Sequence, residues 1–354
     1  MELTSLRAVG IVEKDQDNGL MWTWTYPSLT QDEKQYALSK CCLSWNEKPD
    51  ASKIIPFVFS HYMKQWYYIF TAAPSEPTPL KSVAYFSIVL LASDFNPEKY
   101  AVLTRILSKF YEESGNPVRI LEQYLMIVTK GLCHSNSNGV FKVQSFSQEK
   151  AYTAASLKDV INVFEIQSII LYTAILLKKK VLVYHNKLEL LLEITRALPA
   201  FVWHRQDWNC LYPWVHDKEQ ELTALLKLPH FIVGTTEEDL LKQEDYDIYA
   251  NVPAKTITVS PHAKESLTMG KLHKDIAKKM LEICENESSS NKQLIMGIDE
   301  KTTELLDKLR SLGSETGAGK TIIKPEDVRS KNFHTTTTGF LINLAISEQL
   351  LEFD

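Results

Sequence analysis

An apolar helix that runs almost directly into a short apolar strand is the feature that most restricts the fold of this chain. Residues 160–178 show mostly apolar helical spacing, and residues 180–184, Lys-Val-Leu-Val-Tyr, have the pattern of a strand buried on both faces. A further helix is predicted at residues 188–198, with strands at 230–234 and 255–260. Because helices and strands alternate, the sequence predicts a layered α/β lobe.

The first 130 residues have a different order, with strands first and a pair of helices afterwards. A hairpin is predicted from residues 6–13 and 21–26, joined by a turn that contains Asn18-Gly19. Its second strand alternates strictly, which predicts one face carrying its three aromatic side chains, Trp22, Trp24 and Tyr26. The later elements are predicted as a helix at residues 32–43, strands at 54–59, 66–71 and 82–91, and helices starting at Asn96-Pro97 and near Val118.

These patterns divide the chain into four segments. We expect an N-terminal lobe at residues 1–134, a linker at 135–156, an α/β lobe at 157–260 and a mainly helical region at 261–354. The fold class is therefore α/β, with an N-terminal α/β module and a C-terminal layered α/β module that ends in helices.

Charge, cysteine spacing and hydropathy exclude several classes of function. A formal net charge of −5 argues against a nucleic-acid partner, which requires a basic face. Five cysteines without a Cys-x-x-Cys pair predict reduced thiols, with no disulfide frame and no zinc site. The longest apolar runs, residues 83–92 and 169–177, are shorter than the roughly 20 residues of a membrane span. The first residues lack the pattern of a signal peptide, so we expect a cytosolic protein without a transmembrane segment.

The run Gly317-Ala318-Gly319-Lys320-Thr321 resembles a nucleotide-binding loop but fails on spacing. A phosphate-binding loop requires G-x-x-x-x-G-K-[ST], and the position of its first glycine is occupied here by Ser314. An amphipathic helix precedes the run where a buried strand is required, and Pro325 follows within one turn. We predict a loop whose glycines allow movement or partner docking, with no nucleotide cofactor.

Other motifs of covalent and metal chemistry are also missing from the sequence. It contains no G-x-S-x-G elbow, no G-x-G-x-x-G after the first strand and no H-E-x-x-H. We therefore predict no catalytic residue, no cofactor and no metal site. The acidic residues 237–239 and 244–247 fit a solvated loop better than a cation site. The lysine-rich helix at residues 271–280 fits a packed bundle helix or, as an alternative, a membrane-surface helix.

An aromatic cluster at residues 201–214 is the best candidate for a binding site. Tryptophan, tyrosine and arginine are the residues enriched at the energetic centres of protein interfaces. The predicted partner-binding residues are Trp203, Arg205, Gln206, Asp207, Trp208, Tyr212 and Trp214. Packing of the same aromatic residues into the core remains the alternative.

Several segments of the sequence form a recognisable series. They are residues 9–14 and 22–27, 95–100 with the helix after it, 175–184, the Trp203 to Trp214 turn, 228–234, and Asp245-Tyr246-Asp247. The order of these segments resembles the DENN domain family. The resemblance covers nearly the whole chain, and the remaining C-terminal helices resemble a reduced downstream part of the domain. It departs from the family at Lys178-Lys179-Lys180, where many members carry Glu-Arg-Arg.

The resemblance implies a longin-like N-terminal lobe and guanine nucleotide exchange on a Rab GTPase in endosomal, specifically late endosomal, trafficking. Such an exchange factor needs no covalent chemistry, because a partner that binds the nucleotide-free GTPase more tightly weakens nucleotide binding by linkage. The alternative is a non-catalytic adaptor subunit of a larger endosomal trafficking assembly. Both imply a cytoplasmic protein that associates peripherally with endosomes through its partners.

Overall fold

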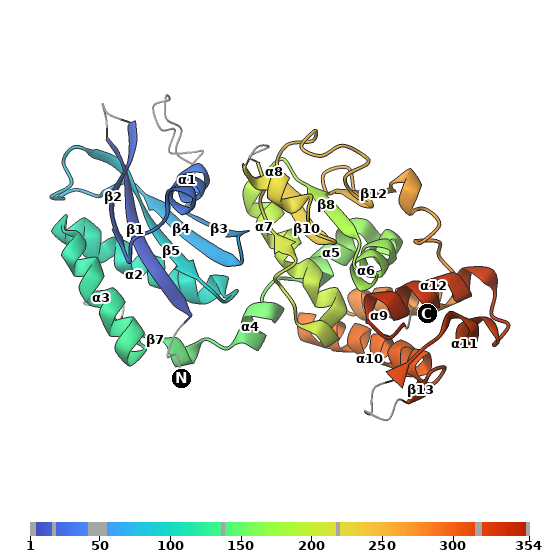
Figure 1. The fold of residues 1–354 in the computed structure, drawn as a ribbon. Helices are drawn as coiled ribbons and strands as arrows, with labels where there is room; N and C mark the ends of the chain where they lie inside the picture. Colours follow the sequence, from blue (N-terminus) through green and yellow to red (C-terminus); the bar gives the residue numbers. More distant parts are fainter. Residues whose placement is uncertain are drawn as a thin grey trace. The chain divides into compact units, whose positions relative to one another are not determined.

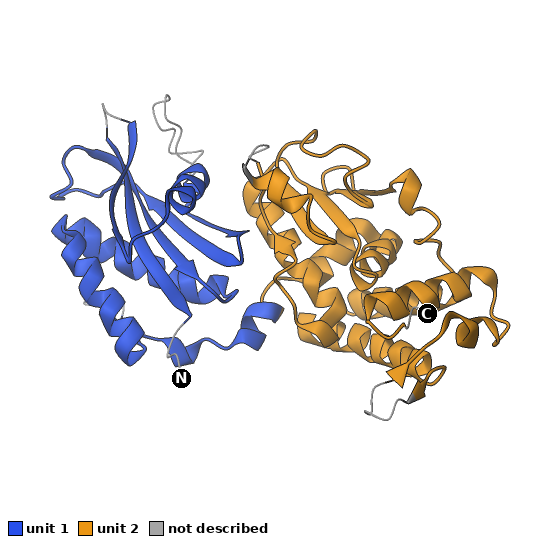
Figure 2. Cartoon of the chain, viewed as in Figure 1, with its two compact units in different colours: residues 1–152 blue, residues 153–354 orange. Residues whose placement is uncertain are grey.

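The structure is a computed structural model that describes residues 5–15, 19–41, 55–135, 139–216, 220–315 and 321–351. The chain forms two compact units, residues 1–152 and residues 153–354 (Figure 2). Both units combine helices with a five-stranded sheet, which confirms the α/β class and the two-lobe architecture expected from the sequence (Figure 1).

Unit 1 is built on an antiparallel sheet with strand order β2-β1-β5-β4-β3. The central strand β5 is an almost continuous apolar run and is buried along most of its length, as expected for a strand covered on both faces. The strands are β1 (Leu6–Asp15), β2 (Gly19–Tyr26), β3 (Phe57–Tyr62), β4 (Gln65–Ala72) and β5 (Val83–Ala92).

Helices cover both faces of this sheet (Figure 1). On β4, Tyr67 contacts Tyr36 of α1 (Gln31–Lys40), whereas its neighbour Tyr68 stacks on Tyr100 of α2 (Pro97–Ser114) with ring centroids 4.3 Å apart. Because successive strand residues point to opposite faces, α1 and α2 lie on opposite sides of the sheet. The helix α3 (Pro117–Lys130) packs beside α2.

The start of α2 is where the sequence predicts it. Asn96 caps the helix by accepting a hydrogen bond from the Lys99 backbone N–H, and Pro97 occupies the first turn. The helix ends at Gly115, whose φ of 59° lies in the left-handed region that glycine adopts without strain. The predicted start and end of α2 are therefore confirmed. Both depend on residues within one helical turn, which is why they can be read from the sequence.

The predicted common face of Trp22, Trp24 and Tyr26 is wrong. Strand β2 contains a bulge: Ile11 pairs with Trp24 but the next residue, Val12, pairs with Trp22. The extra residue inverts the alternation. The indole N–H of Trp22 therefore donates to the carbonyl of Lys34 in α1, while Tyr26 contacts Tyr124 of α3 on the other face.

The segment predicted as a linker, residues 135–156, contains regular structure. Strands β6 (Leu132–Ser135) and β7 (Gly139–Lys142) pair as a hairpin, followed by η2 (Val143–Ser145) and α4 (Gln148–Thr153). The side chain of Gln148 donates to the backbone carbonyl of Phe95 at 2.6 Å. This contact ties the start of α4 to the body of unit 1.

Unit 2 contains a mixed sheet with strand order β12-β11-β8-β10-β9. Strand β8 is parallel to both of its neighbours, and only β12 runs antiparallel to its partner. The short strands β9 and β11 have no counterpart in the sequence prediction. The strands are β8 (Lys180–Tyr184), β9 (Leu211–Tyr212), β10 (Phe231–Thr235), β11 (Ile248–Asn251) and β12 (Thr256–Val259).

Strand β10 shows how the layers of unit 2 are arranged. Phe231 and Val233 point into a core cluster that includes Leu225 of α8 (Gln220–Leu225). Gly234 faces the other way, and a Cβ there would lie 2.9 Å from the Thr195 side chain of α7 (Leu188–Ala197). Helices α7 and α8 therefore cover opposite faces of the sheet.

The long apolar helix predicted at residues 160–178 is broken into three parts. They are α5 (Leu157–Phe164), the 3-10 turn η3 (Glu165–Gln167) and α6 (Ser168–Leu176). The break occurs at Glu165, whose φ is 48°. Apolar spacing continues through the break because both helices contribute to one core, so periodicity alone could not show it.

The rest of unit 2 is mainly helical, as predicted. The predicted loop that contains Gly317 lies largely outside the described residues, between the paired strands β13 and β14. The elements are η4 (Leu198–Arg205), η5 (Pro261–Ala263), α9 (Lys271–Glu285), α10 (Asn291–Arg310), β13 (Ser314–Glu315), β14 (Thr321–Ile322), α11 (Pro325–Arg329) and α12 (Thr335–Ser347).

One helical stretch, Gln148–Leu176, has the length and apolar composition of a membrane span, with a mean hydropathy of 1.5 in its most apolar window. However, 61% of that window is buried within the structure. Such burial is typical of a core helix in a globular protein, so the stretch is weak evidence for a membrane segment.

The contact between Gly10 and Trp22 yields a test of the fold of unit 1. A Cβ on Gly10 would lie 2.3 Å from the Trp22 ring, so Gly10→Ala should lower the free energy of unfolding by about 1–3 kcal/mol. Gly339→Ala is the control, because nothing lies within 4 Å of the added methyl group and α12 gains about 0.5–1 kcal/mol from alanine. Urea denaturation followed by tryptophan fluorescence measures both changes. Equal stability of wild type and Gly10→Ala would contradict the observed packing.

Candidate functional site

The described residues hold no metal-binding cluster, and two of their cysteine thiols are poorly reactive. Among them, no group of three histidine, cysteine, aspartate or glutamate side chains lies close enough to hold a metal ion. Burial raises the pKa of the Cys133 thiol to about 11, and burial followed by the charge of Asp207 raises that of Cys210 to about 12. Both thiols are therefore protonated near neutral pH and are poor nucleophiles. The functional candidates are surfaces.

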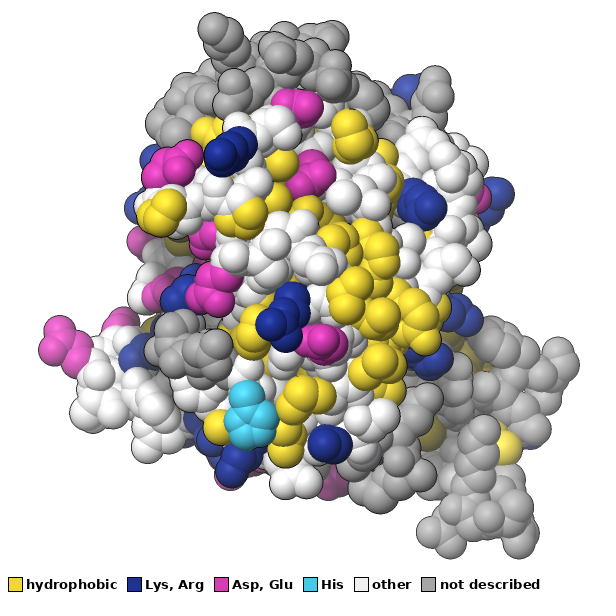
Figure 3. All heavy atoms as spheres, turned by 90° about the vertical axis from the view of Figure 1, so that its left-hand side faces the viewer, with side chains coloured by type: hydrophobic (Ala, Val, Ile, Leu, Met, Phe, Trp, Pro, Cys, Tyr) yellow, Lys and Arg dark blue, Asp and Glu magenta, His cyan; other side chains and the backbone are white. Residues whose placement is uncertain are grey.

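An apolar surface lies on unit 1 where the edge strand β2 meets α3. Tyr26 is 41% exposed and packs edge-on against Tyr124 of α3, with Trp24 stacked beside it at 6.5 Å. On α3, Leu125 is 43% exposed. We call this the β2–α3 surface and define it by Trp24, Tyr26, Leu121, Leu125 and Val128. Figure 3 shows apolar side chains gathered on the side of the molecule that carries these elements.

The β2–α3 surface arises because α3 is apolar on two sides. Its buried face carries Ile120, Tyr124 and Ile127. The second stripe, Leu121, Leu125 and Val128, has the same helical spacing but lies half-buried or exposed. This surface is not among the sites predicted from the sequence, although the two apolar stripes in residues 118–128 indicate it.

The aromatic residues predicted to bind a partner are mostly in the interior. Trp203 and Trp208 are 7% and 2% exposed and contact each other edge-on, with ring centroids 6.4 Å apart. The indole N–H of Trp208 donates to the carbonyl of Arg196 in α7. Trp214 is also buried and stacks on His216. In this structure the three tryptophans are therefore core residues, as the alternative interpretation held.

The polar residues between these tryptophans reach the surface. Gln206 and Asp207 are exposed in the turn that follows η4. The Asp207 carboxylate accepts hydrogen bonds from the backbone and the side chain of Asn209, both at 2.9 Å, which holds the turn in one shape. Tyr212 is half-buried in β9, and burial raises the pKa of its hydroxyl. Among the predicted partner-binding residues, Gln206 and Asp207 are the exposed ones.

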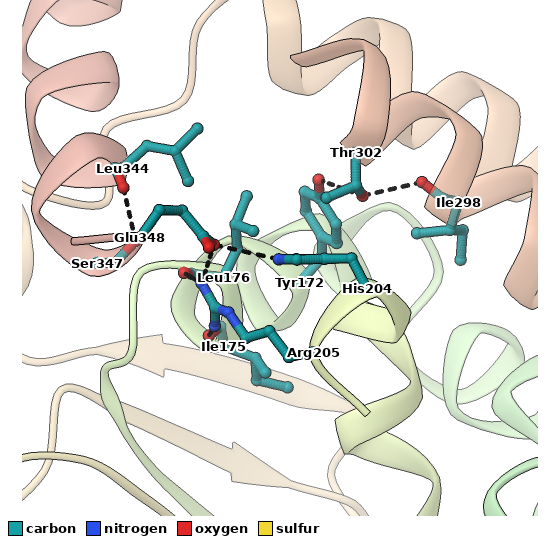
Figure 4. Close-up of polar contacts among 10 residues, drawn as sticks. All are labelled: Tyr172, Ile175, Leu176, His204, Arg205, Ile298, Thr302, Leu344, Ser347 and Glu348. Atoms are coloured by element: carbon teal, nitrogen blue, oxygen red, sulfur yellow. Dashed lines mark hydrogen bonds and ion pairs between the residues drawn. The ribbon is translucent and has the colours of Figure 1, made fainter. Parts of the chain in front are cut away.

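Arg205 forms the centre of a polar cluster that fastens the C-terminal helix. Its guanidinium donates to the carbonyl oxygens of Ile175 and Leu176 at the end of α6 and to the carboxylate of Glu348, just after α12 (Figure 4). His204 contacts the same carboxylate at 3.1 Å. We call this cluster the C-terminal clamp. Its partners lie far apart in the sequence, so no local motif could reveal it.

The electrostatics of the clamp favour the ionised form of Glu348. Burial would raise the pKa of this carboxyl, but hydrogen bonds and charge from His204 and Arg205 outweigh burial and lower it to about 2. Nearby, the hydroxyls of Tyr172 in α6 and Thr302 in α10 form a buried hydrogen bond of 2.9 Å (Figure 4). Together these contacts connect α6, η4, α10 and the end of α12.

The lowered pKa of Glu348 predicts how stability depends on pH. Because the folded-state pKa of about 2 lies below the ordinary value of 4.5, the ionised carboxylate stabilises the fold above about pH 4.5. We expect Glu348→Gln to lower the free energy of unfolding by about 2–3 kcal/mol at pH 7. The difference from wild type should shrink as pH falls below 4.5.

Denaturation at a series of pH values measures this difference. Glu282→Gln is the control, because Glu282 pairs with an exposed lysine, Lys278, at 3.6 Å, and such pairs contribute little. If the difference in unfolding free energy between wild type and Glu348→Gln stayed constant from pH 7 to pH 3, the stabilising role of the ionised Glu348 carboxylate would be contradicted.

Comparison with known proteins places the chain in a family. Residues 154–261 match the model of the family described as SPA, stabilization of polarity axis. The chain is 42% identical over 346 residues to DENN domain-containing protein 10 of Danio rerio, covering 98% of this chain and 97% of that protein. It is 41% identical over 347 residues to the Homo sapiens protein of the same name, covering 97% and 96%.

The similarity extends to a distant organism. DENN domain-containing protein 10 of Dictyostelium discoideum is 34% identical over 361 residues, covering 97% of each chain. Both units are included in these matches, and unit 2 also contains the family-model match. The chain therefore belongs to the DENN domain family, among the relatives named DENN domain-containing protein 10.

Proposed function

We propose that this chain is a guanine nucleotide exchange factor for a Rab GTPase in late endosomal trafficking, acting in the cytoplasm and reaching endosomes through its partners. The observation that supports this proposal is the near full-length membership in the DENN family of trafficking proteins, which generally implies Rab partners. The protein would bind the nucleotide-free GTPase more tightly than the loaded form, and linkage would weaken nucleotide binding by the same factor.

This activity requires a shaped surface rather than a reactive group. A 10³-fold acceleration of GDP release corresponds to about 4 kcal/mol of preferential binding to the transition state, which one interface can supply. The GTPase itself holds Mg²⁺ and the phosphates in ordered switch segments, and the exchange factor acts by displacing these segments. No nucleotide site is therefore needed on this chain.

We propose that the exposed turn at Gln206 and Asp207 contacts the GTPase. The turn lies between two buried tryptophans, Trp203 and Trp208, which hold it in place from below. A rigid support of this kind reduces the conformational entropy lost on binding. In this proposal Gln206 and Asp207 contact the GTPase, whereas the buried tryptophans hold the turn in its conformation.

Release of fluorescent GDP from a full panel of Rab GTPases tests the proposed activity. We expect acceleration for at least one Rab, and a tenfold or greater loss of kcat/KM for Asp207→Lys, because a charge is reversed at the interface. Glu244→Lys, at an exposed position in the loop before β11, is the matched control and should keep its activity. If no Rab in the panel showed faster GDP release, the proposed exchange function would be wrong. If both variants had equal activity, only the proposed contact between the turn and the GTPase would be wrong.

A specific observation also supports the second candidate, an adaptor subunit of an endosomal trafficking assembly. The β2–α3 surface combines exposed aromatic and aliphatic side chains on an edge strand and its neighbouring helix. Contiguous apolar patches of this kind mark protein-binding sites, and aromatic residues dominate their binding energy. An adaptor would use this surface independently of any GTPase.

A charge placed on the β2–α3 surface tests the adaptor function. Leu125→Glu should abolish stable association with the partner, because a charge would be buried without a counterion at the interface. Leu190→Glu is the control, since Leu190 is 48% exposed but lies on α7 in unit 2. Affinity purification with quantitative mass spectrometry compares stoichiometric partners of the two variants and wild type. Identical partners for all three would contradict the proposal.

A further inference from the structure

A hollow in unit 2 lies where the corner between α6 and β8, the start of β10 and the end of α12 meet. Its volume is about 360 Å³. Its floor and rim include the apolar residues Leu177, Pro229 and Ile346. The polar lining consists of Lys178, Lys179, His230, Asn343, Ser347 and Gln349.

The lining carries positive charge without a carboxylate to balance it. Lys178 and Lys179 are half-buried, and neither forms an ion pair with a carboxylate in the part of the chain that the structure describes. The pKa of the His230 imidazole is lowered, first by burial and then by the positive charges of Lys178 and Arg205. The negative charge of Asp207 acts in the opposite direction. A neutral imidazole beside two ammonium groups leaves the hollow cationic.

The C-terminal clamp binds negative groups that lie beside the hollow. The carbonyl oxygens of Ile175 and Leu176 at the negative end of α6 accept hydrogen bonds from Arg205 (Figure 4). The carboxylate of Glu348 is bound by Arg205 and His204 (Figure 4). The Asp207 carboxylate also lies near, lining an adjoining pocket with the two lysines, and it accepts hydrogen bonds from Asn209. Two ammonium groups beside one carboxylate leave a net positive charge that attracts an anion from solution.

The backbone at Lys178 has a conformation that is useful for testing the hollow. Lys178 ends α6 in the left-handed conformation, with φ of 50°, and the N–H of Lys179 donates back to the carbonyl of Ala174 at 2.8 Å. Glycine is the usual residue at this helix-ending position, because a Cβ is strained there. A lysine at such a position costs stability that glycine would not.

We propose that this hollow binds the phosphate group of an anionic ligand. Lys178 and Lys179 would supply the charge, and the side-chain amides of Asn343 and Gln349 would donate hydrogen bonds to phosphate oxygens. The exposed Ile346 on the rim would contact the apolar part of the ligand. The phosphate could be carried by a phosphoinositide headgroup on a membrane or by a small phosphate compound in solution. The site is independent of exchange activity.

Three variants of the full chain separate charge from stability. Lys178→Gly removes the ammonium group and relieves the backbone strain, so its Tm should equal or exceed that of wild type. Lys179→Gln removes the neighbouring charge. Lys278→Gln is the control, because it removes a lysine from α9 whose side chain is 78% exposed and lies outside the hollow.

Binding is measured with two probes, in low and in high salt. Sedimentation with phosphatidylcholine vesicles, with and without phosphatidylinositol phosphates, tests the lipid source, and calorimetric titration with inorganic pyrophosphate tests the soluble source. We expect Lys178→Gly and Lys179→Gln each to weaken binding about tenfold, which corresponds to about 1.4 kcal/mol, with salt weakening it further. Lys278→Gln should bind as wild type does.

Each outcome is decisive. Vesicle binding that is lost in both hollow variants supports a lipid headgroup, and pyrophosphate binding lost in the same variants, without vesicle binding, supports a soluble phosphate. Absence of binding to either probe, or equal binding by Lys178→Gly, Lys179→Gln and wild type, overturns the proposal. The Tm of Lys178→Gly shows that any loss of binding comes from the missing charge and not from unfolding.

Discussion

The structure of unit 2 depends on one guanidinium group. Arg205 caps the last carbonyls of α6 immediately before the central strand β8 begins, and the same group binds Glu348 after the last helix. A half-buried arginine of this kind is stabilising because its two terminal nitrogens donate hydrogen bonds and a carboxylate balances its charge. One side chain therefore positions both the end of α6 and the end of the C-terminal helix α12.

The clamp also shapes the surface around it. By neutralising the C-terminal end of α6 and the carboxylate of Glu348, it leaves Lys178 and Lys179 as the dominant charges of the neighbouring hollow. At the other side of Arg205, the chain turns outward at Gln206 and Asp207. A structural residue thus lies between two candidate binding surfaces, and neither of them contains a reactive group.

Unit 1 offers a different kind of surface. Its sheet has an exposed edge at β2, and natural proteins usually protect such edges with charge, a bulge or a covering element. Here a bulge turns Trp22 toward α1 and leaves Trp24 and Tyr26 beside α3. The resulting apolar area is suited to binding another protein, which is why an adaptor function deserves testing alongside nucleotide exchange.

The sequence by itself determined the elements whose signals are local. The Asn96-Pro97 start of α2, its end at Gly115 and the apolar run of β8 each depend on neighbouring residues, and the structure confirms them. The order of such segments was enough to indicate the DENN family. Spacing also showed that the run ending in Lys320-Thr321 lacks the first glycine of a phosphate-binding loop.

Only the tertiary structure decided which side chains are available for binding. An aromatic residue has the same composition signal in a core as in an interface, so the sequence could not show that Trp208 is buried whereas Tyr26 is exposed. The bulge in β2 depends on pairing with β1, and the bond between Arg205 and Glu348 joins residues 143 positions apart. Contacts across such distances leave no local pattern, because they arise only when the chain has folded.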